Sequence, residues 1–107
     1  MTTPHGYIEK LAELTSSGRG LVAVTLVDAV GSTPQDAGSK MLVTSNGLEF
    51  GTVGGGRVER MALEHAQKML AAESSKTSFV EWNLQRDVGM TCGGTVKMFF
   101  ESINHRQ

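Results

Sequence analysis

The chain has 107 residues, a single cysteine and a formal net charge of -1 at pH 7. A length of this order fits one domain, the balanced charge argues against a nucleic-acid partner, and one cysteine cannot form an intramolecular disulfide. The chain also has neither the basic start and apolar core of a signal peptide nor an apolar run of 18 residues, so the sequence predicts a cytoplasmic protein without a membrane segment.

Seven elements are predicted along the chain, in the order αβββαββ. The first helix begins at Pro4, after an N-cap residue, and stops at the turn residues that start with Ser16. The second helix follows three glycines and runs to about Ala72. The predicted strands cover residues 21–29, two segments within 41–53, residues 77–84 and residues 95–102. This order predicts a compact single domain over residues 1–107, of the α/β class (α+β mixed).

The apolar patterns within the strands predict how the sheet is buried. Residues 21–29 are almost continuously apolar, as expected of a strand that is covered on both faces. Asn46-Gly47 is a strong hairpin signal between the next two strands. In the last two strands the alternating positions Val80, Trp82, Leu84, Val96, Met98 and Phe100 are expected to face the core. We therefore expect a mixed sheet of about five strands with a β-hairpin and two main helices.

Three consecutive glycines, Gly54, Gly55 and Gly56, stand directly before the second helix. Glycine loses more backbone freedom on folding than any other residue, so such a run needs a reason. If Gly56 is the N-cap, Glu59 is the third helical residue, where its carboxylate can reach back to the cap amide. The free amides of this helix start could bind an anion, and Arg57 adds donors suited to phosphate. The alternative is a turn in which glycine only permits close packing.

Two other segments are rich in glycine and polar residues. Residues 30–40 form a long turn-rich connection, and residues 85–94 place Cys92 directly before two glycines. A thiol beside backbone amides can have a lowered pKa and act as a nucleophile or a soft-metal ligand. Equally, a free cysteine is often a small buried hydrophobic residue. The residues themselves leave both interpretations of Cys92 open.

The remaining candidates favour structural roles. His65 shares one side of the second helix with apolar residues, which indicates a core or edge histidine rather than a ligand. One cysteine and three scattered histidines show no metal-ligand spacing. The sequence also contains no recognisable catalytic triad or pair of catalytic carboxylates.

Three segments, GSTPQDAGSKMLV, GTVGGGRVE and GMTCGGTVKMFFE, occur in the order and spacing of a known family. The chain resembles the xanthine dehydrogenase accessory factor family (XdhC/CoxI type) from the first helix to the last strand. This resemblance implies a chaperone rather than an enzyme. Such a protein binds the molybdenum cofactor (molybdopterin) as cargo, assists its sulfuration by a cysteine desulfurase and delivers it to a molybdenum hydroxylase.

The same resemblance implies a cofactor-binding surface made by the three motifs. Carried over by position, and with Arg57 added, the candidate residues are Gly31, Ser32, Pro34, Gly38, Gly54, Gly55, Gly56, Arg57, Glu59, Cys92, Gly93 and Gly94. The glycine segments would receive the phosphate of the cofactor, and Cys92 would face its molybdenum or exchangeable sulfur.

The chain departs from the family pattern in two respects. Many relatives have a cysteine where this chain has Arg57, so a mechanism with two thiols is not available here. Typical relatives continue into a Rossmann-like domain, whereas this chain is expected to be a single XdhC/CoxI-like domain, free-standing or part of a split system. Two other functions remain open: a sulfurtransferase that carries a persulfide on Cys92, and a docking module for a separate Rossmann-domain protein.

The last predicted strand suggests how copies of the chain associate. Phe99 points away from the side of the strand that Phe100 shares with the core residues, so a large aromatic side chain lies on the second face of the sheet. Small domains often cover such a face with another subunit. We therefore expect a homodimer.

Overall fold

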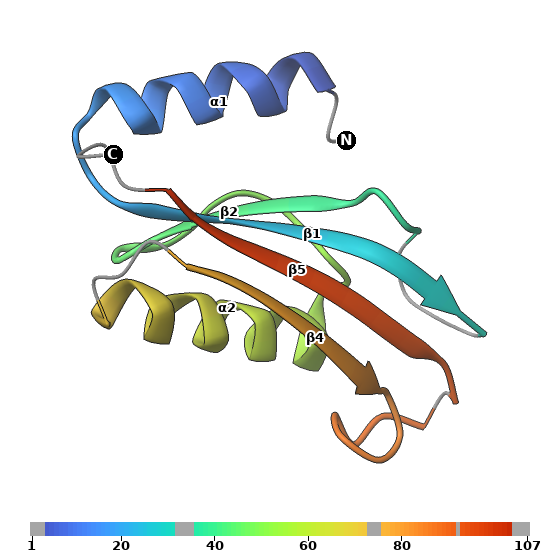
Figure 1. Ribbon diagram of the computed structural model, residues 1–107. Coiled ribbons are helices and arrows are strands. Elements are labelled where there is room, and N and C mark those ends of the chain that lie inside the picture. Colours follow the sequence, from blue (N-terminus) through green and yellow to red (C-terminus); the bar gives the residue numbers. More distant parts are fainter. Residues whose placement is uncertain (1–3, 32–35, 73–75, 92, 104–107) are drawn as a thin grey trace.

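The computed structural model describes residues 4–31, 36–72, 76–91 and 93–103. Its elements are α1 (Pro4–Ser16), β1 (Leu21–Val30), β2 (Lys40–Thr44), β3 (Gly47–Gly51), α2 (Gly56–Ala71), β4 (Thr77–Asn83) and β5 (Thr95–Ile103). The strands form one sheet in the order β3-β2-β1-β5-β4, with α1 and α2 on opposite faces (Figure 1). The predicted class, the five strands, the hairpin and the two helices are confirmed.

The sheet is antiparallel in every described strand pair, whereas the sequence predicted a mixed sheet. Helix α2 carries the chain beneath the sheet from β3, at one edge, to β4, at the other edge (Figure 1). β4 therefore runs in the same direction as β3 and β1, but β5 returns between β4 and β1. Because β5 separates these two strands, no parallel pair forms.

The larger part of the core lies between the sheet and α2. The predicted alternation is confirmed there, since Val96, Met98 and Phe100 of β5 are at most 1% exposed. On α2 the fully buried positions are spaced four residues apart, at Val58, Ala62 and Ala66. Because 3.6 residues make one turn, this spacing places small and medium side chains along one helical stripe against the strands.

A smaller core lies on the other face, under α1. It is formed by Leu14, Leu21, Ala23 and Leu42, with Tyr7, Leu11, Phe50 and Ile103 packed against them. This helix covers only part of the face, so the prediction that β1 is buried on both sides holds for its first half alone. Val27, at the irregularity between Leu26 and Asp28, is 47% exposed, and Val30 beyond it is 58% exposed. Phe79, which pairs with Phe99 on the same uncovered area, is 58% exposed.

His65 has the structural role that its position predicted. Its ring centroid lies 4.4 Å from that of Phe100, and its Nε2 is 2.9 Å from the Ser78 hydroxyl on β4. Burial and the positive charge of Lys68 together lower the pKa of this imidazole. His65 therefore joins α2 to the edge of the sheet in its neutral form.

This environment predicts that the domain loses stability in mild acid. Because the folded-state pKa lies below the unfolded value of about 6.5, the unfolded chain binds more protons as the pH falls from about 7 towards 5. The contribution of neutral His65 is therefore fully present above the unfolded pKa and is lost below it. Urea unfolding at pH 7.5 and 5.5 should show a smaller pH dependence in His65→Gln. An equal pH dependence in both proteins would contradict this assignment.

Candidate functional site

The described glycine-containing parts of the three motifs lie at one end of the domain (Figure 1). Val30 at the end of β1 pairs with Thr95 at the start of β5, and Thr95 also pairs with Asn83 at the end of β4. At the same end, Gly51 finishes β3 and the chain turns into α2. The antiparallel topology thus brings together residues that are more than 60 positions apart in the sequence.

The glycines before α2 are required by their backbone conformation. Gly54, Gly55 and Gly56 have φ angles of 151°, 67° and 54°, a region that other residues adopt at a cost. A Cβ atom at Gly55 or Gly56 would meet nothing within 4 Å. Close packing therefore does not explain these two glycines, because the space where their side chains would be is open.

The helix begins one residue earlier than the sequence predicted. Gly55 rather than Gly56 is the N-cap, and no side chain caps the helix. The carboxylate of Glu59 does not reach back to the cap amide, because it accepts a hydrogen bond from the Thr52 hydroxyl. The Thr52 oxygen in turn accepts the amide of Gly54 at 3.2 Å. The amide of Glu59 donates to the Gly55 carbonyl at 3.3 Å. The amides of residues 56–58 come before this bond and have no carbonyl partner inside the helix.

Arg57 links the helix start to the loop between β4 and β5. Its Nη1 donates a hydrogen bond to the Gly89 carbonyl oxygen at 2.6 Å. Gly89 itself has a φ of 82°, and a Cβ atom there would lie 2.9 Å from the same nitrogen. The guanidinium is exposed, and one of its five N–H donors makes this bond.

The first and third motifs contact each other through backbone. A Cβ atom on Gly31, whose φ is 82°, would lie only 3.2 Å from the Cα of Gly94. Here glycine does permit a close approach, in contrast to Gly55 and Gly56. Gly38 has a φ of 97°, and its amide donates to the Leu26 carbonyl at 2.7 Å, next to the start of β2.

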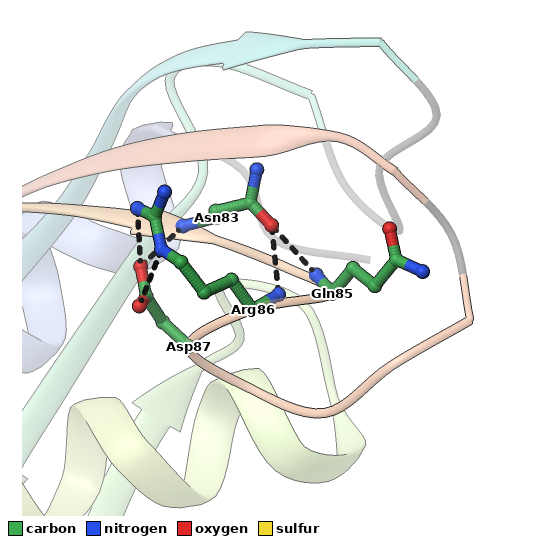
Figure 2. A network of polar contacts seen from close by, with 4 residues as sticks. All are labelled: Asn83, Gln85, Arg86 and Asp87. Atoms are coloured by element: carbon green, nitrogen blue, oxygen red, sulfur yellow. Dashed lines mark hydrogen bonds and ion pairs between the residues drawn. The ribbon is translucent and has the colours of Figure 1, made fainter.

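Residues 83–87 form a turn held by side-chain hydrogen bonds just before the third motif (Figure 2). The Asn83 side-chain oxygen accepts the amides of Gln85 and Arg86 at 3.1 and 2.8 Å, while the Asn83 amide donates to the Asp87 carboxylate at 2.8 Å. Hydrogen bonds from the Arg86 guanidinium and from the Asn83 amide lower the pKa of Asp87. The turn is therefore stabilised by hydrogen bonds from nearby backbone amides to the Asn83 and Asp87 side chains, which is common for asparagine and aspartate.

Most of the predicted site residues are brought to this end of the domain. Ser32, Pro34 and Cys92 lie outside the described residues, so their placement is not part of the site geometry. Gly93 is exposed, and Gly94 is buried and accepts the amide of Leu84 at 2.9 Å.

Sequence reasoning missed three residues that organise the site. They are Thr52, which orders the turn before the glycines, Gly89, which accepts the Arg57 bond, and Asn83, which orders the turn after β4. An asparagine followed four residues later by aspartate at the end of a strand was the available signal for Asn83. No local sequence pattern predicts the bonds of Thr52 or Gly89. The partner of Gly89 is distant in the sequence, and Thr52 reaches its partners only because the chain bends before α2.

The described residues contain no group of three or more His, Cys, Asp or Glu side chains that could hold a metal ion. Neither α1 nor α2, the helices of the described chain, has the length and apolar character needed to cross a membrane.

The chain is similar in sequence to known proteins. The sequence model of the XdhC and CoxI family matches residues 14–82. The whole chain is 30% identical over 109 aligned positions to the molybdenum cofactor insertion chaperone PaoD of Escherichia coli, covering 34% of that protein. It is also 33% identical over 92 positions to the uncharacterized protein YqeB of the same organism, covering 82% of this chain and 16% of YqeB.

A solved structure shares the fold. The crystal structure of a xanthine dehydrogenase from Bacillus halodurans superimposes with a TM-score of 0.73 at 24% identity, over 91% of this chain and 30% of that one. The present chain thus spans about a third or less of the length of each of these proteins.

Proposed function

The chain belongs to the XdhC and CoxI family, and from this premise we propose that it is a chaperone that binds the molybdenum cofactor and delivers it to a molybdenum hydroxylase. The observation that carries the proposal is the open space beside Gly55 and Gly56 at the start of α2, to which Arg57 joins the loop of the third motif. The first motif contacts the third where Gly31 meets Gly94. The relative PaoD is itself named a molybdenum cofactor insertion chaperone. Delivery requires binding and release of the cargo, so no catalytic group is needed.

The chemistry of the cargo suits this end of the domain. Molybdopterin carries a phosphate, and the first amides of a helix, which have no carbonyl partner within the helix, are donors suited to phosphate. The exposed guanidinium of Arg57 adds positive charge beside them. The third motif also contains Cys92, whose proposed role towards molybdenum rests on the family resemblance and on the affinity of thiolates for soft metals.

The proposed partners follow from the same role. They are the molybdenum hydroxylase that receives the cofactor, a cysteine desulfurase that supplies sulfur, and a Rossmann-domain protein. The exposed Phe79 and its neighbour Phe99 support the proposed homodimer, because an uncovered aromatic pair favours association. Light scattering at micromolar concentration tests the dimer.

The proposed function predicts that cofactor co-purifies with the protein. When the chain is produced in cells that make the cofactor, oxidation of the purified protein should release the fluorescent pterin, in an amount near one per chain. We expect Cys92→Ala to hold at least about tenfold less, since it loses a charged or metal-bound contact. The Arg60→Ala protein, altered on the exposed side of α2, is the control and should keep its cofactor.

Other outcomes would assign a different function. Absence of pterin from the unmodified protein would contradict cofactor binding and favour a docking module. A mass increase of 32 Da on Cys92 after incubation with a desulfurase and cysteine would favour a persulfide-carrying sulfurtransferase. Equal pterin content in Cys92→Ala would refute the role of the thiol while leaving the phosphate-binding role in place.

A further inference from the structure

A hydrogen bond between Arg57 and Gly89 joins α2 to the β4–β5 loop. The two residues are 32 positions apart, and their bond is short, at 2.6 Å. A charged donor on a carbonyl oxygen makes one of the stronger kinds of hydrogen bond. A Cβ atom at Gly89 would lie 2.9 Å from Nη1, so a side chain at that position would displace the end of the flexible arginine.

Backbone contacts connect Gly89 to Gly94 of the third glycine motif and to the first motif. Gly89 is followed by Met90, whose amide donates to the Leu84 carbonyl at 2.9 Å, and the Leu84 amide donates to the Gly94 carbonyl at 2.9 Å. Gly94 in turn lies against Gly31 at the end of β1. A fixed position of Gly89 relative to α2 therefore also fixes the helix start relative to the other two glycine motifs.

We propose that Arg57 is a positioning residue that fastens the β4–β5 loop to the start of α2. Its contribution to binding would then come mainly from holding two backbone segments at a constant separation, and only partly from its charge. For ligand binding this inference rests on the proposed function, but the fastening of the loop is a property of the free protein. An experiment can therefore contradict the fastening of the loop without contradicting ligand binding, and the reverse.

Hydrogen exchange of the ligand-free protein tests the fastening directly. In Arg57→Ala we expect amides in the peptide covering residues 85–91 to exchange about three- to tenfold faster, because a charge-assisted bond at an exposed site is lost. Arg60→Ala removes an exposed arginine from the same helix and should leave this peptide unchanged. Arg57→Lys, which keeps a long cationic donor, should restore part of the protection.

Gly89→Ala tests the same bond from the other side. The added methyl group displaces the guanidinium and also strains the backbone, because Gly89 has a φ of 82°. Exchange should therefore increase even though the arginine remains. In the double variant Arg57→Ala/Gly89→Ala the two effects should combine to less than their product, since both remove one interaction.

The outcomes separate the inference from its alternatives. Equal exchange in Arg57→Ala and Arg60→Ala would overturn the fastening role, whatever the protein binds. Faster exchange in Arg57→Ala, with partial recovery in Arg57→Lys, would support it even if no pterin co-purified. In that case the proposed function would fail and the positioning role would stand.

Discussion

Gly51→Ala is expected to lower the free energy of unfolding by about 3 kcal/mol or more, enough to unfold a marginal domain. Gly51 ends β3 with a φ of 77°, which disfavours any side chain. A Cβ atom there would also overlap the Lys40 carbonyl oxygen, in the neighbouring strand. Since this obstacle is backbone and not a flexible side chain, the two strands would have to separate to relieve it.

Gly47→Ala is the matched control for this substitution. Gly47 lies at the other end of β3 and also has a positive φ, 119°, but a Cβ atom there would meet nothing within 4 Å. It should therefore cost only the conformational strain, about 1 kcal/mol. Urea unfolding of both variants measures the difference, and equal losses of stability would show that strain and not overlap dominates at Gly51.

Much of the fold could be predicted because the signals were local. The alternation in β5 placed Val96, Met98 and Phe100 correctly. The hairpin was found from Asn46-Gly47, although its turn residues are Ser45 and Asn46 and Gly47 already begins β3. The pairing of strands is not a local property. Nothing in the sequence of β5 shows that it returns between β1 and β4, and this insertion is what makes the sheet antiparallel.

The sequence predicted which segments contribute to the candidate site, but not the hydrogen bonds that join them. The glycine run before α2 was identified, and its three positive φ angles explain the residue type. In contrast, Glu59 was expected to bond to the helix cap and bonds to Thr52 instead. Two donors were within reach of the Glu59 carboxylate, the amide at the helix cap and the Thr52 hydroxyl. Residue spacing cannot tell which of them it bonds, because a shift of one residue in the helix start changes which donor is nearer. The Arg57–Gly89 bond depends on tertiary structure alone.

The glycines at the start of α2 allow a direct test of anion binding. Gly56 is exposed, has a φ of 54°, and has open space where a side chain would be. Asparagine and aspartate tolerate positive φ better than other residues. Gly56→Asn and Gly56→Asp are therefore expected to fold, with a similar loss of about 1 kcal/mol in the free energy of unfolding. They differ in one negative charge.

That charge should decide whether the cofactor binds. A carboxylate a few ångströms from a phosphate near the protein surface costs about 2 kcal/mol or more, which corresponds to a roughly thirtyfold weaker affinity. A carboxylate at the positive end of a helix also favours the unliganded protein. We therefore expect Gly56→Asp to lose at least about thirtyfold in affinity for molybdopterin, and Gly56→Asn less than about threefold, in binding followed by pterin fluorescence. Increasing salt should reduce the difference between the two variants, because screening weakens repulsion between exposed charges. Equal affinities at low salt would place the phosphate of the cofactor away from the start of α2.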